Sequence, residues 1–253
     1  MTLLQAIILG VVEGFTEFLP ISSTAHLILA SQLLGLKQTE FQKTFEIAIQ
    51  LGAILSVILL YWRKFLNLQV LGRVITAFIP TGVIGFGLYK VVKTYFMDSE
   101  AIVLWSLFIG GVVLIVFELL HREADDAVAD VEAIPYTKCA LIGVFQSISM
   151  IPGVSRAGAT IVGGLILGLS RSTIVEFSFL LAVPTMLAAT LYDLYKNAAS
   201  FAPQEFGVLA AGFIASFVVA LIAIKFLLAY VRTNTFIPFG VYRILVAAAF
   251  AFL

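Results

Sequence analysis

The sequence predicts an all-α polytopic membrane protein of two inverted-topology repeats, each a re-entrant helical hairpin plus three transmembrane helices. Three observations carry this prediction. The composition is 61% hydrophobic and only 12% charged, whereas soluble domains are about a quarter charged. Several apolar runs are long enough to cross a hydrocarbon core of roughly 30 Å. Two pairs of shorter apolar runs, one pair in each half, are separated by a break that contains proline and serine.

The first short pair occupies residues 3–18 and 24–36. About 16 residues make a helix of roughly 24 Å at 1.5 Å per residue, which is short for a membrane span. Pro20 cannot continue the first helix, and the hydroxyl residues after it are natural N-caps for the second. We therefore expect a re-entrant hairpin, because irregular backbone at membrane depth needs surrounding protein or a wet cavity. One kinked span is the alternative.

Longer runs follow at residues 44–62, 71–92 and 101–120, each expected to span the membrane. An acidic solvated loop, 121–135, then marks the midpoint of the chain. The plan repeats with short runs at 136–150 and 157–169 and expected spans at 174–194, 207–231 and from 236 to the C-terminus. The pattern Gly10…Pro20-x-x-Ser23 is echoed by Gly143…Pro152-x-x-Ser155.

The predicted organisation is a single integral membrane domain, 1–253, with repeat one at about 1–120 and repeat two at about 136–253. Three spans per half is an odd number, so the second half runs inverted, and a site is expected at the repeat interface. Lysine and arginine counting places the midpoint loop in the cytoplasm with both termini outside. The N-terminus has no basic segment and is expected to be retained rather than cleaved.

Composition also excludes some function classes. The formal net charge is zero, which gives no basis for nucleic-acid binding. A single cysteine rules out an internal disulfide and a cysteine metal cluster.

The polar residues gather at the two breaks. Glu13 and Glu17 are four apart and share one helix face, and carboxylates in an apolar span mark a functional site by default. Helix N-termini after the breaks are expected to bind anions, and Arg156 adds a fork-shaped donor suited to phosphate.

Carboxylates beside phosphate would repel it, and a bound Mg²⁺ or Ca²⁺ resolves the conflict, with Glu13 and Glu17 as metal ligands. His26, one turn beyond Ser23, is placed to activate Ser23 or a water, or to protonate a leaving oxygen.

Simpler interpretations stay open for each group. The two glutamates would also suit a proton or cation site in a transporter, the hydroxyls would serve as caps alone, Arg156 as a counter-ion to a glutamate, and His26 as a packed residue. A supporting layer around the site is expected from Glu46, Gln50 and Gln146. Helix-end or interfacial positions are expected for Glu118, His121, Glu176, Lys225 and Arg243.

The residues Glu13-Gly-Phe-Thr-Glu-Phe-Leu-Pro-Ile-Ser-Ser-Thr-Ala-His26 resemble the first signature of the undecaprenyl-diphosphate phosphatases, the bacitracin-resistance membrane enzymes. The stretch 152–160, PGVSRAGAT, resembles their second signature, PGxSRSGxT, and 45–52 and Tyr242-Arg243 resemble further family stretches. Two departures are Ala157, where the motif usually has serine, and Ala25, where glycine is common.

The resemblance implies hydrolysis of the C55 isoprenoid diphosphate to the monophosphate, which recycles the lipid carrier of cell-wall synthesis. It implies a divalent cation and a bacterial inner (plasma) membrane location, with the site facing the periplasm or cell exterior. Expected partners are the isoprenoid diphosphate and membrane lipid; a homodimer is left open. A transporter or lipid flippase on the same scaffold is the alternative. The implied catalytic residues are Glu13, Glu17, Ser23, His26 and Arg156, and the substrate contacts assigned with them are Ser22, Thr24, Gly153, Ser155 and Thr160.

Overall fold

The protein is described here as a computed structural model covering residues 1–37, 39–96, 99–197 and 206–251. Apart from one isolated bridge, all regular structure in these ranges is helical. The helices are α1 (Leu3–Thr16), α2 (Ser23–Leu33), α3 (Glu40–Phe65), α4 (Leu68–Tyr95), α5 (Glu100–Leu120), η1 (Val131–Ala133), α6 (Tyr136–Ser147), η2 (Ile148–Met150), α7 (Arg156–Ile166), α8 (Arg171–Asn197), α9 (Phe206–Tyr230) and α10 (Ile237–Ala251).

Each predicted helix is present, with ends that differ from the prediction by a few residues, as helix boundaries commonly do. Within the described ranges, five helices are long and apolar enough to cross a membrane: Thr44–Phe65, Leu68–Leu88, Glu100–Leu120, Arg171–Ala188 and Phe206–Tyr230. The chain is therefore a multi-pass membrane protein. The sixth expected span corresponds to α10, whose 15 residues reach about 22 Å, and the last two residues of that prediction lie outside the described ranges.

Side-chain caps set several helix starts. Thr2 and Gln5 form a reciprocal capping box at the start of α1. The side chains of Thr39, Asn67 and Ser99 each accept a hydrogen bond from a backbone N–H in the first turn of α3, α4 and α5. Because these caps use polar residues between apolar runs, the local sequence determines where the helices begin.

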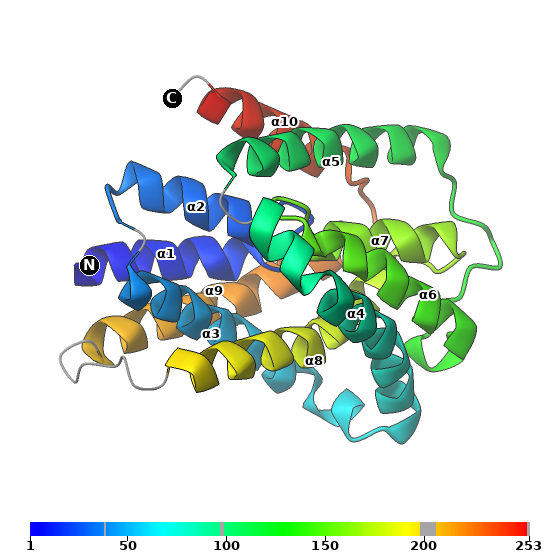
Figure 1. The fold of residues 1–253 in the computed structure, drawn as a ribbon. Coiled ribbons are helices and arrows are strands. Elements are labelled where there is room, and N and C mark those ends of the chain that lie inside the picture. The colour runs from blue at the N-terminus through cyan, green and yellow to red at the C-terminus, as the bar shows by residue number, and fades with distance from the viewer. Residues whose placement is uncertain (38, 97–98, 198–205, 252–253) are drawn as a thin grey trace.

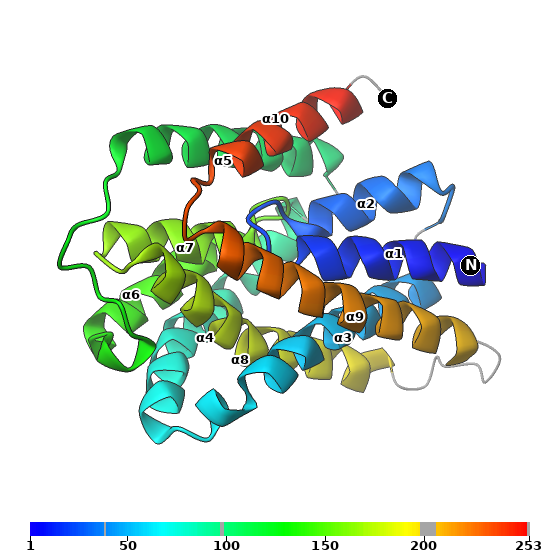
Figure 2. The same ribbon diagram turned by 180° about the vertical axis from the view of Figure 1, so that it is seen from behind.

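Glycines let three helix pairs approach closely. On α1, a Cβ added at Gly10 would lie 2.4 Å from the backbone oxygen of Gly212 on α9. On α6, a Cβ at Gly143 would lie 1.9 Å from that of Ala77 on α4. A Cβ at Gly111 on α5 would lie 2.6 Å from the oxygen of Gly240 on α10. The first helix of each short pair thus packs against a long helix from the other half of the chain, and α5 and α10 lie side by side along one edge of the bundle (Figures 1 and 2).

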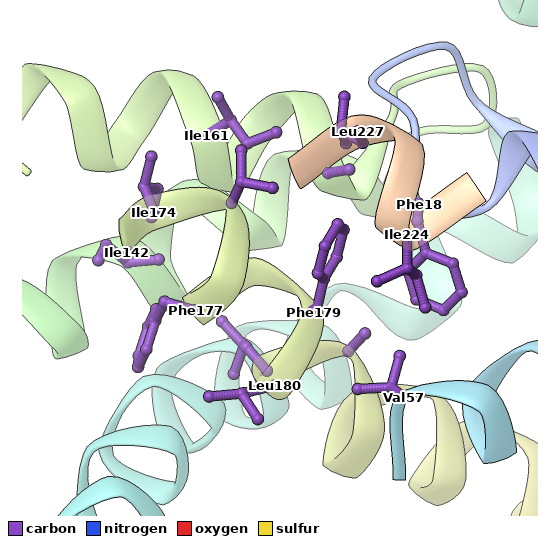
Figure 3. Close-up of a cluster of buried hydrophobic side chains, with 14 of the residues drawn as sticks. Phe18, Val57, Ile142, Ile161, Ile174, Phe177, Phe179, Leu180, Ile224 and Leu227 are labelled. Atoms are coloured by element: carbon purple, nitrogen blue, oxygen red, sulfur yellow. The ribbon is translucent and has the colours of Figure 1, made fainter. Parts of the chain in front are cut away.

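The largest apolar cluster joins both short pairs to α8. Phe18 and Phe179 meet edge-to-face with ring centroids 5.4 Å apart, and both side chains are fully buried. Figure 3 shows Ile142 of α6 and Ile161 of α7 in the same cluster, beside residues of α8 and α9. This packing holds the first break, and the helix that follows the second break, against a common support.

The midpoint loop is more ordered than the predicted solvated loop. Val128 exchanges backbone hydrogen bonds with Gly168 and Ser170 at 3.0 Å each, and Val131 and Ile134 are buried. The acidic side chains are exposed or partly exposed, but the apolar residues, which recur every third position, anchor the loop to the segment before α8. The loop lies at the opposite end of the bundle from the start of α1 and the end of α10 (Figures 1 and 2).

Candidate active site

The two breaks meet in the middle of the fold. Ser155 at the start of α7 donates a hydrogen bond to the Leu19 carbonyl in the first break, at 3.4 Å. The guanidinium of Arg243 on α10 donates to the carbonyls of Pro20 (3.1 Å) and Gly153 (3.2 Å), one from each break. Segments more than 130 positions apart in sequence are thereby held together by main-chain acceptors.

Arg243 was predicted to be a helix-end or interfacial residue, and that prediction is wrong. Its side chain is only 2% exposed, and it also donates to the carbonyls of Leu107 (3.2 Å) and Ser106 (2.9 Å) on α5. Four carbonyl dipoles compensate its charge. An arginine in the middle of an apolar helix was the signal that could have identified this position.

Gly110→Ala is expected to destabilise this clasp. A Cβ at Gly110 would lie 2.0 Å from Nη2 of Arg243, so the guanidinium would have to leave the carbonyls that hold it. Overpacking of this kind costs about 1–3 kcal/mol, which a lowered unfolding temperature in detergent would report. Gly87→Ala on α4 is the matched control, since no atom lies within 4 Å of its added Cβ; equal unfolding temperatures for the two variants would contradict the clasp.

The ion pair of Glu17 and Arg156 forms the centre of the site. Their Oε1 and Nη2 atoms are 2.9 Å apart, and the two side chains are 8% and 10% exposed. Ser23 donates its hydroxyl to the other oxygen of Glu17, and Nη1 of Arg156 donates to the Ser178 carbonyl at 3.0 Å. The structure therefore joins three predicted catalytic residues, and Arg156 has the glutamate partner that the counter-ion interpretation expected.

Unused hydrogen-bonding capacity remains at this pair, on Arg156 itself and on the neighbouring Glu13. Both carboxylate oxygens of Glu13 are buried without a hydrogen-bond partner, and so is Nε of Arg156. Glu13 lies within electrostatic range of Glu17 and Arg156, one turn before Glu17 on the same face. Buried polar groups without partners are costly, so a pair of unused acceptors and an unused donor indicates groups kept for a ligand.

The helix starts at the two breaks are capped differently. Ser155 accepts a hydrogen bond from the Gly158 N–H at 3.1 Å, as an N-cap does. Ser22 occupies the N-cap position of α2, but its side chain makes no capping hydrogen bond, and its φ of 71° is unusual for a residue other than glycine. The prediction that its hydroxyl caps this helix is therefore wrong. Strain of this kind is retained where the surrounding structure enforces it, often at functional sites.

His26 is held by residues other than Ser23. Its Nδ1 lies 2.8 Å from the Ser22 carbonyl, and its Nε2 lies 2.9 Å from the hydroxyl of Tyr242 on α10. Because the Ser23 hydroxyl is directed at Glu17, the carboxylate rather than the imidazole is the base in contact with it. Tyr242 was noted in the sequence only as part of a family-like stretch, with no role.

The other predicted substrate contacts differ in their burial and in their hydrogen bonds. Thr24 is exposed at the start of α2. Gly153 adopts a φ of 89°, and a Cβ there would lie 2.5 Å from the Val103 oxygen. Both its backbone conformation and this close approach therefore require glycine. Thr160 is fully buried, and its hydroxyl is shared with Ser178 at 2.6 Å.

The three residues predicted to support the site divide into two groups. Glu46 on α3 accepts a hydrogen bond from a glutamine one turn earlier (3.0 Å), and Gln50 lies half-buried one turn further along. Gln146 on α6 instead donates to Thr81 and Thr185 at 3.0 and 3.1 Å. These contacts join Gln146 to α4 and α8.

The donor set suits a hard divalent cation. Among the described residues, no three side chains of His, Cys, Asp or Glu gather as a ligand set. Mg²⁺ is commonly held by only one or two carboxylates, with water and substrate phosphate oxygens completing its shell. The unpaired carboxylate of Glu13 beside Glu17 fits that mode.

Known proteins of similar sequence belong to one family. The sequence profile of the family described as Bacitracin resistance protein BacA matches residues 6–249. A Sulfurihydrogenibium protein named Undecaprenyl-diphosphatase is 55% identical over 245 residues, which cover 97% of this chain and 96% of that protein. Proteins of the same name from Persephonella marina and Aquifex aeolicus are 53% and 50% identical, covering 99% of this chain and 98% of each relative.

Proposed function

The chain belongs to the bacitracin resistance protein BacA family, and from that membership we infer that it hydrolyses undecaprenyl diphosphate to undecaprenyl phosphate and inorganic phosphate. It is a membrane phosphatase that recycles the lipid carrier of cell-wall synthesis, an activity associated in its family with bacitracin resistance. The isoprenoid chain stays in the bilayer, while the diphosphate head enters between the two breaks.

One observation carries the assignment of the site. The ion pair of Arg156 and Glu17 keeps one unused donor, Nε of Arg156, and the two carboxylate oxygens of nearby Glu13 are buried, unused acceptors. A diphosphate needs donors for its oxygens, and a cation that accompanies it needs carboxylates. A site of this composition matches both halves of a cation–diphosphate ligand.

The chain's own residues have the following proposed roles. Arg156 binds the terminal phosphoryl group through its unused Nε–H. When the head enters, the Nη2–H that Arg156 donates to Glu17 in this structure turns to the phosphoryl group as well. Ser23 attacks the terminal phosphorus while Glu17, already its hydrogen-bond acceptor, takes the hydroxyl proton. A P–O bond to Ser23 forms as the bridging P–O bond breaks and the lipid monophosphate leaves. Water then attacks the phosphoserine: His26 takes a proton from that water, and the proton held by Glu17 returns to the Ser23 oxygen as the P–O bond to Ser23 breaks and inorganic phosphate leaves.

Glu13 and Glu17 are the proposed ligands of a divalent cation, Mg²⁺ or Ca²⁺. A cation held there would neutralise charge on the phosphoryl oxygens. Without one, three groups of negative charge would converge: two carboxylates and the diphosphate. Glu13, which is fully buried and whose two carboxylate oxygens lack a hydrogen-bond partner, gains most from such a cation.

The architecture proposed with this function is a pair of inverted repeats with re-entrant hairpins. Support comes from the exchange of partners: α1 of the first half packs on α9 of the second, and α6 of the second packs on α4 of the first. We place the protein in the bacterial inner membrane with the midpoint loop cytoplasmic and the site open to the outer side. A cysteine introduced in the loop should then react with a membrane-impermeant thiol reagent only after the cells are opened.

Phosphate release by purified protein in detergent tests the function. With a C55 or C15 isoprenyl diphosphate as substrate, we expect release that EDTA abolishes and added Mg²⁺ or Ca²⁺ restores. The cation is required because Glu13 and Glu17 would otherwise repel the substrate. Release that persists undiminished in EDTA would contradict the cation site while leaving the phosphatase assignment intact.

The transporter alternative predicts a different result. Protein that is shown to be folded but releases no phosphate with any cation would favour a carrier on the same scaffold, because fold alone does not choose between them.

A further inference from the structure

The imidazole of His26 is engaged at both ring nitrogens. A carbonyl oxygen can only accept, so the 2.8 Å contact with the Ser22 carbonyl requires a proton on Nδ1. That assignment leaves Nε2 as the nitrogen that gains or loses a proton. Its partner at 2.9 Å is the hydroxyl of Tyr242.

Tyr242 makes a second contact with the same ring. The phenol and imidazole rings are nearly parallel, with 7° between their planes and 5.5 Å between their centroids. Tyr242 is 42% exposed, so it lies at the surface of the bundle while its ring stacks with that of His26. It comes from α10, 216 positions away in the chain.

The neighbouring residue makes this contact rigid. Arg243 is clasped by four main-chain carbonyls on α5 and on the two breaks. Sliding or turning α10 would break those hydrogen bonds, so the hydroxyl of Tyr242 keeps a fixed place relative to the breaks. A site residue supported by a locked neighbour of this kind is held close to its working geometry.

We propose that Tyr242 is a positioning residue for the reaction, holding the imidazole of His26 with Nε2 as the nitrogen that exchanges the proton. A hydroxyl can donate to neutral Nε2 and accept from Nε2–H after protonation, so a proton reaches Nε2 through the Tyr242 hydroxyl, which takes one proton from water as it gives one to the ring. Tyr242 can therefore hold the ring in both states without movement of the ring. This inference rests on the proposed function, because it assigns Tyr242 a part in the same hydrolysis.

Tyr242→Phe is the decisive variant, since phenylalanine keeps the stacked ring and loses only the hydroxyl. We expect kcat for phosphate release to fall about tenfold, which is the size of effect expected when one hydrogen bond to a reacting group is lost. KM should stay within about twofold of wild type, because Tyr242 acts through His26 and not on the diphosphate. Tyr136→Phe is the matched control: Tyr136 is similarly exposed at 50% and lies against Arg73.

A spectroscopic measurement reports the contact independently of activity. The chain has two histidines, so a His121→Gln background leaves His26 as the only imidazole in a ¹⁵N-histidine-labelled sample. We expect Nδ1 to carry the proton in that background. We expect the Nε2 resonance to shift when Tyr242→Phe is added and to stay unchanged with Tyr136→Phe.

Two results would overturn the proposal: a wild-type kcat in Tyr242→Phe, or an Nε2 chemical shift that is unchanged when the hydroxyl is removed. A fall in kcat for Tyr136→Phe equal to that for Tyr242→Phe would also count against it, since a general loss of structure would then explain both. Failure of the proposed function looks different, because the wild-type protein itself would release no phosphate while the ¹⁵N comparison could still be made.

Discussion

Glu13→Gln is expected to abolish phosphate release without lowering the unfolding temperature. The Glu13 carboxylate is fully buried, and neither oxygen has a hydrogen-bond partner. Glutamine has almost the same shape and removes the cost of burying a charge. Loss of a supporting residue around a metal costs about 10–100-fold in activity, so we expect loss of a proposed ligand to cost at least about a hundredfold.

The comparison should be made in EDTA, so that a bound cation does not contribute to the stability of wild-type protein. Glu132→Gln supplies the control, because Glu132 is partly exposed and sits 3.6 Å from Lys64 at the midpoint loop. It should leave phosphate release unchanged. An inactive Glu13→Gln that is also strongly destabilised would mean that Glu13 supports the fold and not a ligand.

Glu17→Gln is expected to be equally inactive but clearly less stable than wild type. Glu17 is the partner of Arg156 at 2.9 Å and the acceptor for the Ser23 hydroxyl. Its neutral amide would leave the buried guanidinium without the carboxylate to which it is directly hydrogen-bonded. A hydrogen bond to a charged group is worth about 1.5–3 kcal/mol, and removing one partner of a buried pair leaves a costly charge behind.

The two glutamate variants should therefore match in activity and differ in stability, which unfolding curves and phosphate release in the same preparations would measure. Adding Arg156→Ala to each variant sharpens the result. It should cost little further stability on top of Glu17→Gln, because the pair is already broken, and the full cost on top of Glu13→Gln. If Arg156→Ala lowered stability by the same amount in both glutamine variants, an ion pair specific to Glu17 would be contradicted.

The predicted helices at 3–18, 136–150 and 207–231 correspond closely to α1, to α6 with η2, and to α9. Apolar run length, proline breaks and polar caps are local properties, and they determine helix position with little reference to the rest of the chain. The short length of α10 and the anchored midpoint loop differ from prediction. The loop's anchoring depends on pairing of Val128 with residues some forty positions away.

For the site, the spacing of Glu13 and Glu17 and the placement of Arg156 at a helix start could be read from the sequence. The partners of these groups could not. Ser23 lies closer in sequence to His26, yet its hydroxyl bonds to Glu17, and Arg156 reaches Glu17 from 139 positions away. A motif specifies which chemical groups are present, but a hydrogen bond depends on the position of both chain segments in space.

The sequence by itself determined a multi-pass helical protein with two polar breaks, because hydropathy and helix periodicity are written into consecutive residues. Only the tertiary structure decided that α10 reaches the candidate site. Arg243 joins carbonyls of both breaks, and Tyr242 meets His26 across 216 positions. Carbonyl acceptors exist on every residue and carry no sequence signature, so which of them surround a buried arginine is decided by how the helices pack.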